Sequence, residues 1–254
     1  MRIARVVALV VVVLAGVAVA LSVPLLTTAA RARSVRGWFR AVIWASGIRL
    51  VATGMSGRSL SDGSPVLVAA NHVSWLDIPT ILAVEPMRVL AKSDVRGWPV
   101  IGLLASRGGT LFIDRRRLRR LPGTVAEMAA TLRAGESVLA FPEGSTWCGR
   151  TGGQFYPATL QSAIDAGVPV RPVSLHYRFT DGTPTTVTAF VGADTMLASV
   201  WRVVSTRGLV VELDASPLVH TRGRTRRETA AEVAAAVKGQ PASVPLPVPE
   251  KTTP

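Results

Sequence analysis

The chain has 254 residues, with 29 lysines and arginines against 16 acidic residues and a formal net charge of +13. Such a charge favours anionic partners, either nucleic acid or an anionic membrane surface. The mean hydropathy of +0.35 favours the membrane, so we expect no nucleic-acid partner. A single cysteine, Cys148, excludes an internal disulfide, and with three widely spaced histidines it predicts no metal site.

The N-terminal segment, residues 1–30, is predicted to be a transmembrane anchor. Residues 6–26 are almost uniformly apolar, and about 20 such residues span a bilayer as a helix. A cleaved signal peptide would also begin with basic residues and an apolar run. This run is long for a signal peptide, and more arginines follow it than precede it. That asymmetry favours a retained anchor in the cell membrane, with the catalytic domain on the cytoplasmic face.

Residues 31–64 are predicted to form an interfacial helix and a linker. Residues 38–52 interleave aromatic residues with arginines, which suits a helix lying at the level of the lipid headgroups. A domain helix that packs its tryptophans inward is an equally good interpretation. Residues 54–64 are rich in Gly, Ser and Asp, which predicts a loop before the next domain.

Residues 65–238 are predicted to form one domain, because apolar runs alternate with helical stretches along it. Strands are expected at 65–70, 87–91, 110–114, 138–141 and 168–177, and helices at 99–106, 124–133, 158–166 and 228–238. The alternation predicts a layered α/β domain with a largely parallel central sheet flanked by helices. A last strand at 208–213 is predicted at the sheet edge. Residues 239–254 are Pro-rich and predicted to be a disordered tail.

Polar residues follow three of the predicted strands: His72, Arg115 and Glu143. Carboxyl ends of parallel strands share one edge of a sheet, so we expect these side chains at a single rim. His72 and Asp77 flank a strand-to-helix junction, where a carboxylate can hold one imidazole nitrogen and leave the other free as a base. No nucleophilic side chain is implied, so this base would take its proton from a substrate hydroxyl.

Four blocks stand in order along the chain. They are Asn71-His72-Val73-Ser74-Trp75-Leu76-Asp77, Gly109-Thr110-Leu111-Phe112-Ile113-Asp114-Arg115, Phe141-Pro142-Glu143-Gly144-Ser145-Thr146 and Val168-Pro169-Val170-Arg171-Pro172-Val173. Together they resemble the four motifs of the glycerolipid acyltransferases, the family of 1-acylglycerol-3-phosphate acyltransferases, over roughly residues 65–177. The resemblance implies transfer of a fatty acyl group from acyl-CoA or acyl carrier protein to a lysolipid hydroxyl. The first-choice acceptor is 1-acylglycerol-3-phosphate, giving phosphatidate in membrane phospholipid biosynthesis, with no resident cofactor.

The same resemblance implies roles for individual residues. His72 would be the general base and Asp77 would orient it. Arg115 would hold the anionic headgroup of the acceptor, as a guanidinium does in a bidentate way. The acceptor would also be bound by a run of four residues: Glu143, Gly144, Ser145 and Thr146. The fourth block would shape the acyl-chain or donor pocket, and its proline indicates an edge strand or a bulge.

Alternatives remain for the acceptor and for the reaction. Thr146 stands where many family members that make phosphatidate carry an arginine, and residues 91–99 look like segments of bacterial relatives that acylate lyso-ornithine lipid. That lipid, or another lysolipid, is the alternative acceptor. A lipid thioesterase or hydrolase would need a nucleophile elbow, and the chain has no Gly-x-Ser-x-Gly. A non-catalytic protein that binds anionic membranes by charge would bind with a steep salt dependence.

Overall fold

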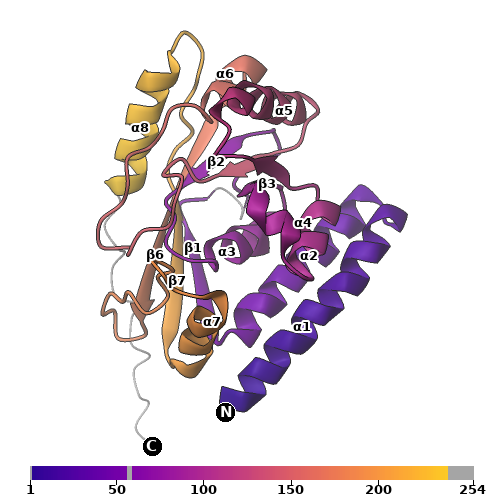
Figure 1. Ribbon diagram of the computed structural model, residues 1–254. Helices are drawn as coiled ribbons and strands as arrows, with labels where there is room; N and C mark the ends of the chain where they lie inside the picture. Colours follow the sequence, from indigo (N-terminus) through magenta and orange to yellow (C-terminus); the bar gives the residue numbers. More distant parts are fainter. Residues whose placement is uncertain (1, 56–58, 240–254) are drawn as a thin grey trace, which may run out of the picture.

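The computed structural model describes residues 2–55 and 59–239, which form a sheet between two layers of helices (Figure 1). The seven strands lie in the order β1-β7-β6-β2-β5-β3-β4. Five of them, from β6 to β4, are parallel, and β7 and β1 run the opposite way. The layered α/β fold with a largely parallel sheet is confirmed. The strands are β1 (Ile48–Thr53), β2 (Leu67–Ala70), β3 (Arg88–Lys92), β4 (Leu111–Ile113), β5 (Val138–Ala140), β6 (Val170–Phe179) and β7 (Leu209–Ala215).

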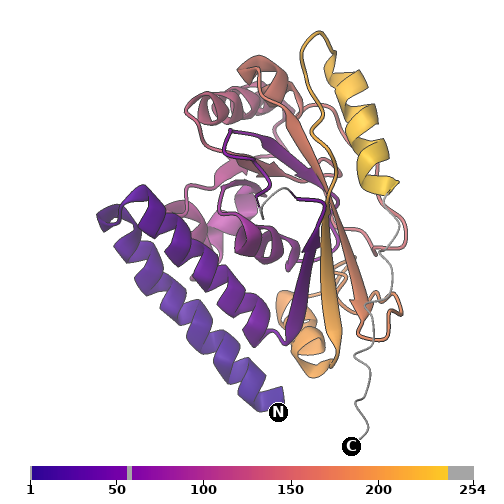
Figure 2. The ribbon, with the colours of Figure 1, turned by 180° about the vertical axis from the view of Figure 1, so that it is seen from behind.

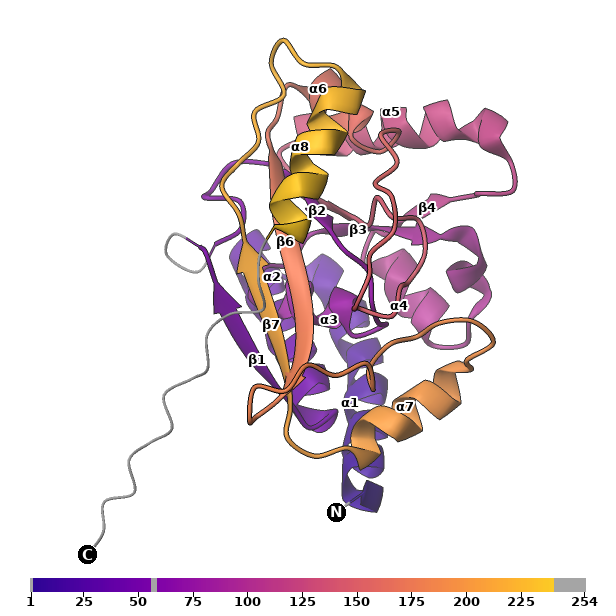
Figure 3. The same ribbon diagram turned by 90° about the vertical axis from the view of Figure 1, so that its left-hand side faces the viewer.

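Helices cover both faces of the sheet (Figure 2). Helices α2, α3 and α7 pack on one face, and α5, α6 and α8 pack on the other, with α8 lying along β6 (Figure 3). Strand β2 shows why its sequence is continuously apolar: Val68 faces the first layer and Leu67 the second, so both faces are buried. The α-helices are α1 (Arg2–Ser22), α2 (Thr28–Ala45), α3 (Asp77–Val84), α4 (Ile101–Arg107), α5 (Leu121–Arg133), α6 (Gln161–Ala166), α7 (Met196–Ser205) and α8 (Arg226–Lys238); the short 3-10 helices are η1 (Val23–Leu25), η2 (Ser93–Gly97) and η3 (Leu118–Arg120).

The sheet begins earlier in the chain than the sequence predicts. Strand β1 lies inside the segment expected to be an interfacial helix and linker, and it pairs in parallel with β7. Strand β7 is therefore an inner strand, and the prediction that it lies at the edge is wrong. β1 has one buried residue at its start and is otherwise partly exposed, because an edge strand is only half covered. In the sequence, the short apolar run of β1 therefore looks like a continuation of the helix before it.

Pro172 lies in an inner strand, so the predicted edge or bulge is also wrong. The carbonyl of Pro172 still accepts from Ser216 N (3.0 Å), and the carbonyl of Ser216 accepts from the guanidinium of Arg171 (3.0 Å). Arg171 is buried and also binds Leu60 O (2.7 Å) and the Asp62 carboxylate (2.6 Å). It thus braces a loop and a strand end inside the domain, and the role of the fourth block in an acyl-chain or donor pocket stays a prediction.

Helices α1 and α2 pack side by side and are joined by η1 (Figures 1 and 2). Trp38 Nε1 donates to Val12 O (2.7 Å), and its ring covers Gly16, where an added Cβ would lie 2.5 Å from the ring. Trp44, six residues further along α2, is 73% exposed. Inward packing, one interpretation of residues 38–52, therefore holds for Trp38, and a position at the lipid headgroups stays a prediction for Trp44. The predicted tail lies, from residue 240, outside the described residues.

Helix α1 is long and apolar enough to cross a membrane. Its exposed side chains recur at helical spacing and form a stripe, which we call the apolar stripe: Ile3, Val7, Val10, Val11, Leu14 and Leu21. On its covered side, Arg5 reaches the end of α7, where Nη1 donates to Val204 O (3.2 Å) and Thr206 O (2.8 Å). The helix is thus fastened to the α/β domain along one side and bare along the other.

Candidate active site

The turn between β2 and α3 brings His72 and Asp77 together. His72 Nδ1 lies 2.7 Å from Asp77 Oδ2, and the Asp77 side chain is fully buried. The same oxygen accepts the backbone N–H groups of Val73 (2.6 Å) and Ser74 (2.8 Å). Asp77 stands in the first turn of α3, where the positive end of the helix dipole favours a carboxylate. The fold therefore holds this carboxylate in one position against the imidazole.

Tyr177 is a member of this site that the sequence did not single out. Its hydroxyl donates to Asp77 Oδ1 (2.6 Å) from β6. Burial, helped by the negative charge of Asp77, raises the pKa of Tyr177 well above its ordinary value, so the hydroxyl stays protonated and remains a donor. Tyr177 shares one face of β6 with Val173 and Leu175, and a polar tip at the end of that apolar face was the available signal.

The free ring nitrogen of His72 is the candidate base. A carboxylate only accepts hydrogen bonds, so Nδ1 carries the proton and Nε2 keeps its lone pair. The ring stacks on Phe141, with centroids 4.0 Å apart and planes at 17°, and the side chain is 18% exposed. The base is therefore fixed in orientation and remains open to a substrate hydroxyl.

Glu143 holds the backbone of the turn between β2 and α3, which we call the catalytic turn. One oxygen accepts His72 N (2.8 Å) and the other accepts Gly153 N (2.9 Å). Burial raises the pKa of Glu143, and the two N–H donors oppose that rise. Gly144, next in the chain, takes a left-handed backbone (φ +74°) and donates to Phe141 O (3.0 Å). These bonds close a tight turn around the base, so both oxygens of Glu143 are occupied by protein.

Ser145 and Thr146 differ in what they offer a substrate. Ser145 is exposed. The Thr146 hydroxyl donates to Phe190 O, and Phe190 N in turn donates to Val73 O (2.9 Å). Thr146 thus fastens the loop of residues 186–194 to the catalytic turn, and its hydroxyl hydrogen is used within the protein.

Arg115 stands apart from the base on the same edge of the sheet. It follows β4, which is parallel to β2 and three strand positions away, roughly 14 Å at ordinary strand spacing. Its side chain is exposed, and within residues 2–55 and 59–239 its guanidinium has no hydrogen-bond or ion-pair partner. The arginines that follow line a cavity of about 510 Å³: Arg116, Arg117, Arg119 and Arg120. This end of the rim can bind an anion.

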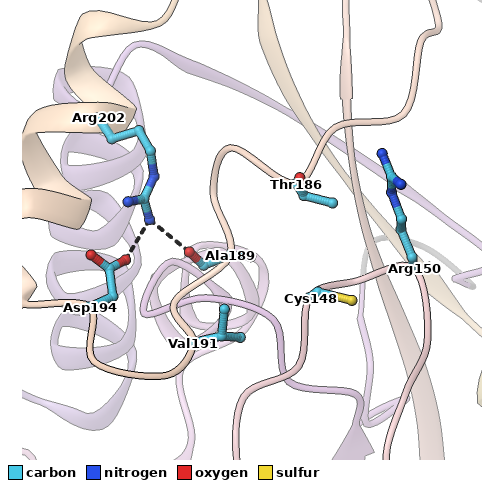
Figure 4. Close-up of a pocket in the computed structure, with 7 residues that line it drawn as sticks. All are labelled: Cys148, Arg150, Thr186, Ala189, Val191, Asp194 and Arg202. Atoms are coloured by element: carbon cyan, nitrogen blue, oxygen red, sulfur yellow. Dashed lines mark hydrogen bonds and ion pairs between the residues drawn. The ribbon is translucent and has the colours of Figure 1, made fainter.

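A second cavity, of about 570 Å³, lies between the segment after β5 and the loop that leads into α7 (Figure 4). Seven residues line it: Cys148, Arg150, Thr186, Ala189, Val191, Asp194 and Arg202. We call it the Arg150 pocket.

In the described part of the chain, no three His, Cys, Asp or Glu side chains come together as a metal site would need.

Comparison with known proteins agrees with this geometry. A family model described as "Acyltransferase" matches residues 53–176. The lyso-ornithine lipid O-acyltransferase of Pseudomonas aeruginosa is 34% identical over 83% of this chain and 79% of its own length. The 1-acyl-sn-glycerol-3-phosphate acyltransferase of Neisseria gonorrhoeae is 41% identical over 59% of this chain and 58% of its own.

One solved structure shares the fold. The crystal structure of the 1-acyl-sn-glycerophosphate acyltransferase PlsC from Thermotoga maritima matches with a TM-score of 0.67, covering 94% of this chain and 95% of that one, at 22% identity. This structure shares the fold, and the family assignment rests on the sequence relatives. The His72–Asp77 pair at the end of β2 is consistent with it. This chain belongs to the acyltransferase family.

Proposed function

We propose that this protein is a lysolipid O-acyltransferase that uses acyl-CoA or acyl carrier protein as donor. The observation that carries the proposal is the buried Asp77 holding His72 with Nε2 free. The acceptor hydroxyl would give its proton to Nε2 as its oxygen attacks the thioester carbonyl. The C–O bond forms, the C–S bond breaks, and the proton passes from Nε2 to the departing thiolate.

The surroundings of His72 support direct transfer over hydrolysis through an acyl-enzyme. Ser74, the hydroxyl nearest in sequence, is fully buried, and its oxygen accepts Leu76 N (3.3 Å). Cys148 Sγ lies 3.8 Å from the Thr151 hydroxyl. A serine or cysteine nucleophile would need to meet Nε2, whereas these two groups are engaged elsewhere.

The acceptor that we put first is 1-acylglycerol-3-phosphate. Arg115 supports it, because an exposed guanidinium at the rim suits a phosphate. The relative from Neisseria gonorrhoeae, whose name gives that acceptor, supports it as well.

Lyso-ornithine lipid is the second candidate acceptor. The hydroxyl of Thr146, which replaces the family's arginine, is bound to Phe190 O and so does not make up the missing phosphate contact. The relative aligned over 83% of the chain is named for that lipid. Both observations favour a headgroup that needs fewer phosphate contacts.

We further propose that the apolar stripe of α1 rests in the cytoplasmic leaflet. Helices α4 and α7 contact α1 and carry further exposed apolar side chains: Ile101, Leu103, Leu197 and Trp201. Because Arg5 and Trp38 fasten α1 to the domain, we place the helix along one leaflet, as an alternative to the transmembrane crossing that the sequence predicts. Val10→Asp should reduce co-flotation of the protein with anionic vesicles, and Ala231→Asp, at an exposed position of α8, should not. Equal flotation of both variants would refute the proposed contact between α1 and lipid.

The activity experiment uses membranes that contain the protein, labelled acyl-CoA or acyl carrier protein, and a panel of lysolipids. His72→Ala should lower turnover by about 10²–10⁴-fold while the protein stays folded and membrane-bound. His220→Ala, at an exposed histidine before α8, is the matched control. Near-normal turnover by His72→Ala would end the proposal, and the lysolipid that is consumed identifies the acceptor.

A further inference from the structure

The Arg150 pocket has one rigid wall. Arg202, on α7, donates to Val187 O and Ala189 O (both 2.7 Å) and pairs with the Asp194 carboxylate (2.6 Å). Figure 4 shows Arg202 and Asp194 on one side of the pocket, with Cys148 and Arg150 on the other. The charge of Arg202 is therefore compensated, and its role is to hold the loop of residues 186–194 in place.

This pocket adjoins the base through the backbone on both of its walls. Trp147 N donates to His72 O (2.7 Å) just before Cys148, and Phe190 N donates to Val73 O (2.9 Å) between Ala189 and Val191. The pocket walls come from the segment after β5 and from the loop between β6 and α7. Arg115 follows β4, the edge strand three positions from β2, and the cavity beside it shares no lining residue with the Arg150 pocket. The two sites are therefore separate, and the Arg150 pocket is the one bonded to the turn that carries His72.

The second wall of the pocket offers a free guanidinium and a turn of backbone N–H groups. Arg150 is exposed, and in the described ranges its guanidinium has no partner. Gly149 takes a left-handed backbone (φ +83°), and this turn aims the N–H groups of Thr151 and Arg150 at the Cys148 sulfur. Those N–H groups lower the pKa of the Cys148 thiol. Consecutive N–H groups in such a turn, beside a free guanidinium, favour an anion.

We propose that the Arg150 pocket binds the phosphate of the phosphopantetheine arm that carries the acyl thioester. This inference rests on the proposed function, because a transferase must hold two substrates at one base. Both substrates are anionic at the end remote from the reacting atoms. With the acceptor headgroup at Arg115, the separate Arg150 pocket beside His72 is left for the donor. The volume of about 570 Å³ is that of an ordinary small-molecule site.

Cys148 lines this pocket and is the only cysteine in the chain, so its alkylation rate reports on occupancy without any turnover. The experiment measures maleimide labelling of the intact protein in detergent micelles. The ligands are S-methyl-CoA, acyl carrier protein with an S-methylated phosphopantetheine arm, 3′,5′-ADP and a lysolipid. S-methyl-CoA and the modified carrier protein should each slow labelling roughly 10-fold near saturation. The lysolipid and 3′,5′-ADP should leave the rate unchanged.

Arg150→Gln provides the kinetic half of the test. It should raise the KM for the donor about 10-fold or more and leave the KM for the acceptor unchanged. Arg222→Gln, at an exposed arginine in the turn before α8, is matched in charge and should change neither value. Protection of Cys148 by S-methyl-CoA should also be weaker in Arg150→Gln.

Three outcomes would overturn the proposal. They are protection by the lysolipid instead of the donors, protection by 3′,5′-ADP to the same extent as S-methyl-CoA, and no protection by either donor. Each is distinct from failure of the proposed function, which would show as a loss of acyl transfer to every lysolipid. If the enzyme transfers acyl groups but no donor protects Cys148, the proposed function stands and the Arg150 pocket is not the donor site.

Discussion

The centre and the flanks of the active-site edge differ in how their polar groups are used. At the end of β2, Asp77 accepts hydrogen bonds from the His72 ring, two backbone N–H groups and Tyr177. At the flanks, Arg115 and Arg150 have no partner within the described residues. Groups bonded inside the protein fix the geometry of His72, and groups left free are available to a ligand. In the function that we propose, the reaction depends on bonds within the fold and the choice of substrate on a few exposed cations.

The largest expected effect concerns Asp77, at the end of β2. Asp77→Asn should lower kcat by about 10²–10⁴-fold, because the amide no longer stabilises the imidazolium that forms as Nε2 takes the proton. Asp181→Asn, in an exposed turn after β6, is the control. Steady-state kinetics with saturating donor and acceptor would check it, and an Asp77→Asn enzyme as fast as the control would remove Asp77 from the mechanism.

The flank predicts a different kinetic signature. Arg115→Gln should raise the KM for the acceptor about 10–100-fold, the range for hydrogen bonds to charged groups, with kcat nearly unchanged. Arg119→Gln, in η3 of the same connection between β4 and α5, removes the same charge and is the matched variant. If both variants raise KM equally, the acceptor senses the general charge of the loop and Arg115 has no special contact.

Tyr177→Phe tests the support beneath the dyad. Loss of the hydroxyl leaves a buried carboxylate oxygen unpaired and should cost about 1–3 kcal/mol of unfolding free energy. Because Asp77 then holds the imidazolium more strongly, the acidic limb of the kcat/KM profile should move to higher pH. Tyr156→Phe is the control, since Tyr156 is 57% exposed. An unmoved pH profile would leave Tyr177 with a purely structural role.

The smallest effect concerns Glu143, whose pKa is raised by burial. As pH rises above the ordinary glutamate pKa, the unfolded chain loses this proton before the native protein does. The unfolding free energy should therefore fall with pH until the native pKa is passed. Glu143→Gln should show a shallower slope over that window in thermal unfolding. Parallel slopes for the variant and the wild type would contradict the buried position of this carboxyl.

The sequence alone predicted the parts of the molecule whose pattern is local. Buried strands such as β2 are continuous apolar runs, and the polar residues after them pointed to one edge of the sheet. Pairings between distant segments left no local pattern. β1 is an edge strand next to a helix, and Arg171 satisfies a carbonyl of another strand. Tyr177 belongs to the site only because β6 extends past the end of β2, and Thr146 meets Phe190 only in the folded chain.

The hydrogen bonds of Arg5 connect α1 to a wall of the Arg150 pocket. Arg5 binds carbonyls at the end of α7, and Arg202 of the same helix fixes the wall of the Arg150 pocket. The N-terminal helix is thus a structural support of the α/β domain, in addition to the lipid contact that we propose for it. A shortened protein that begins after α1 should therefore be impaired even in detergent, where no bilayer is needed. Moving α1 by binding or releasing a membrane would be felt at the loop that faces His72.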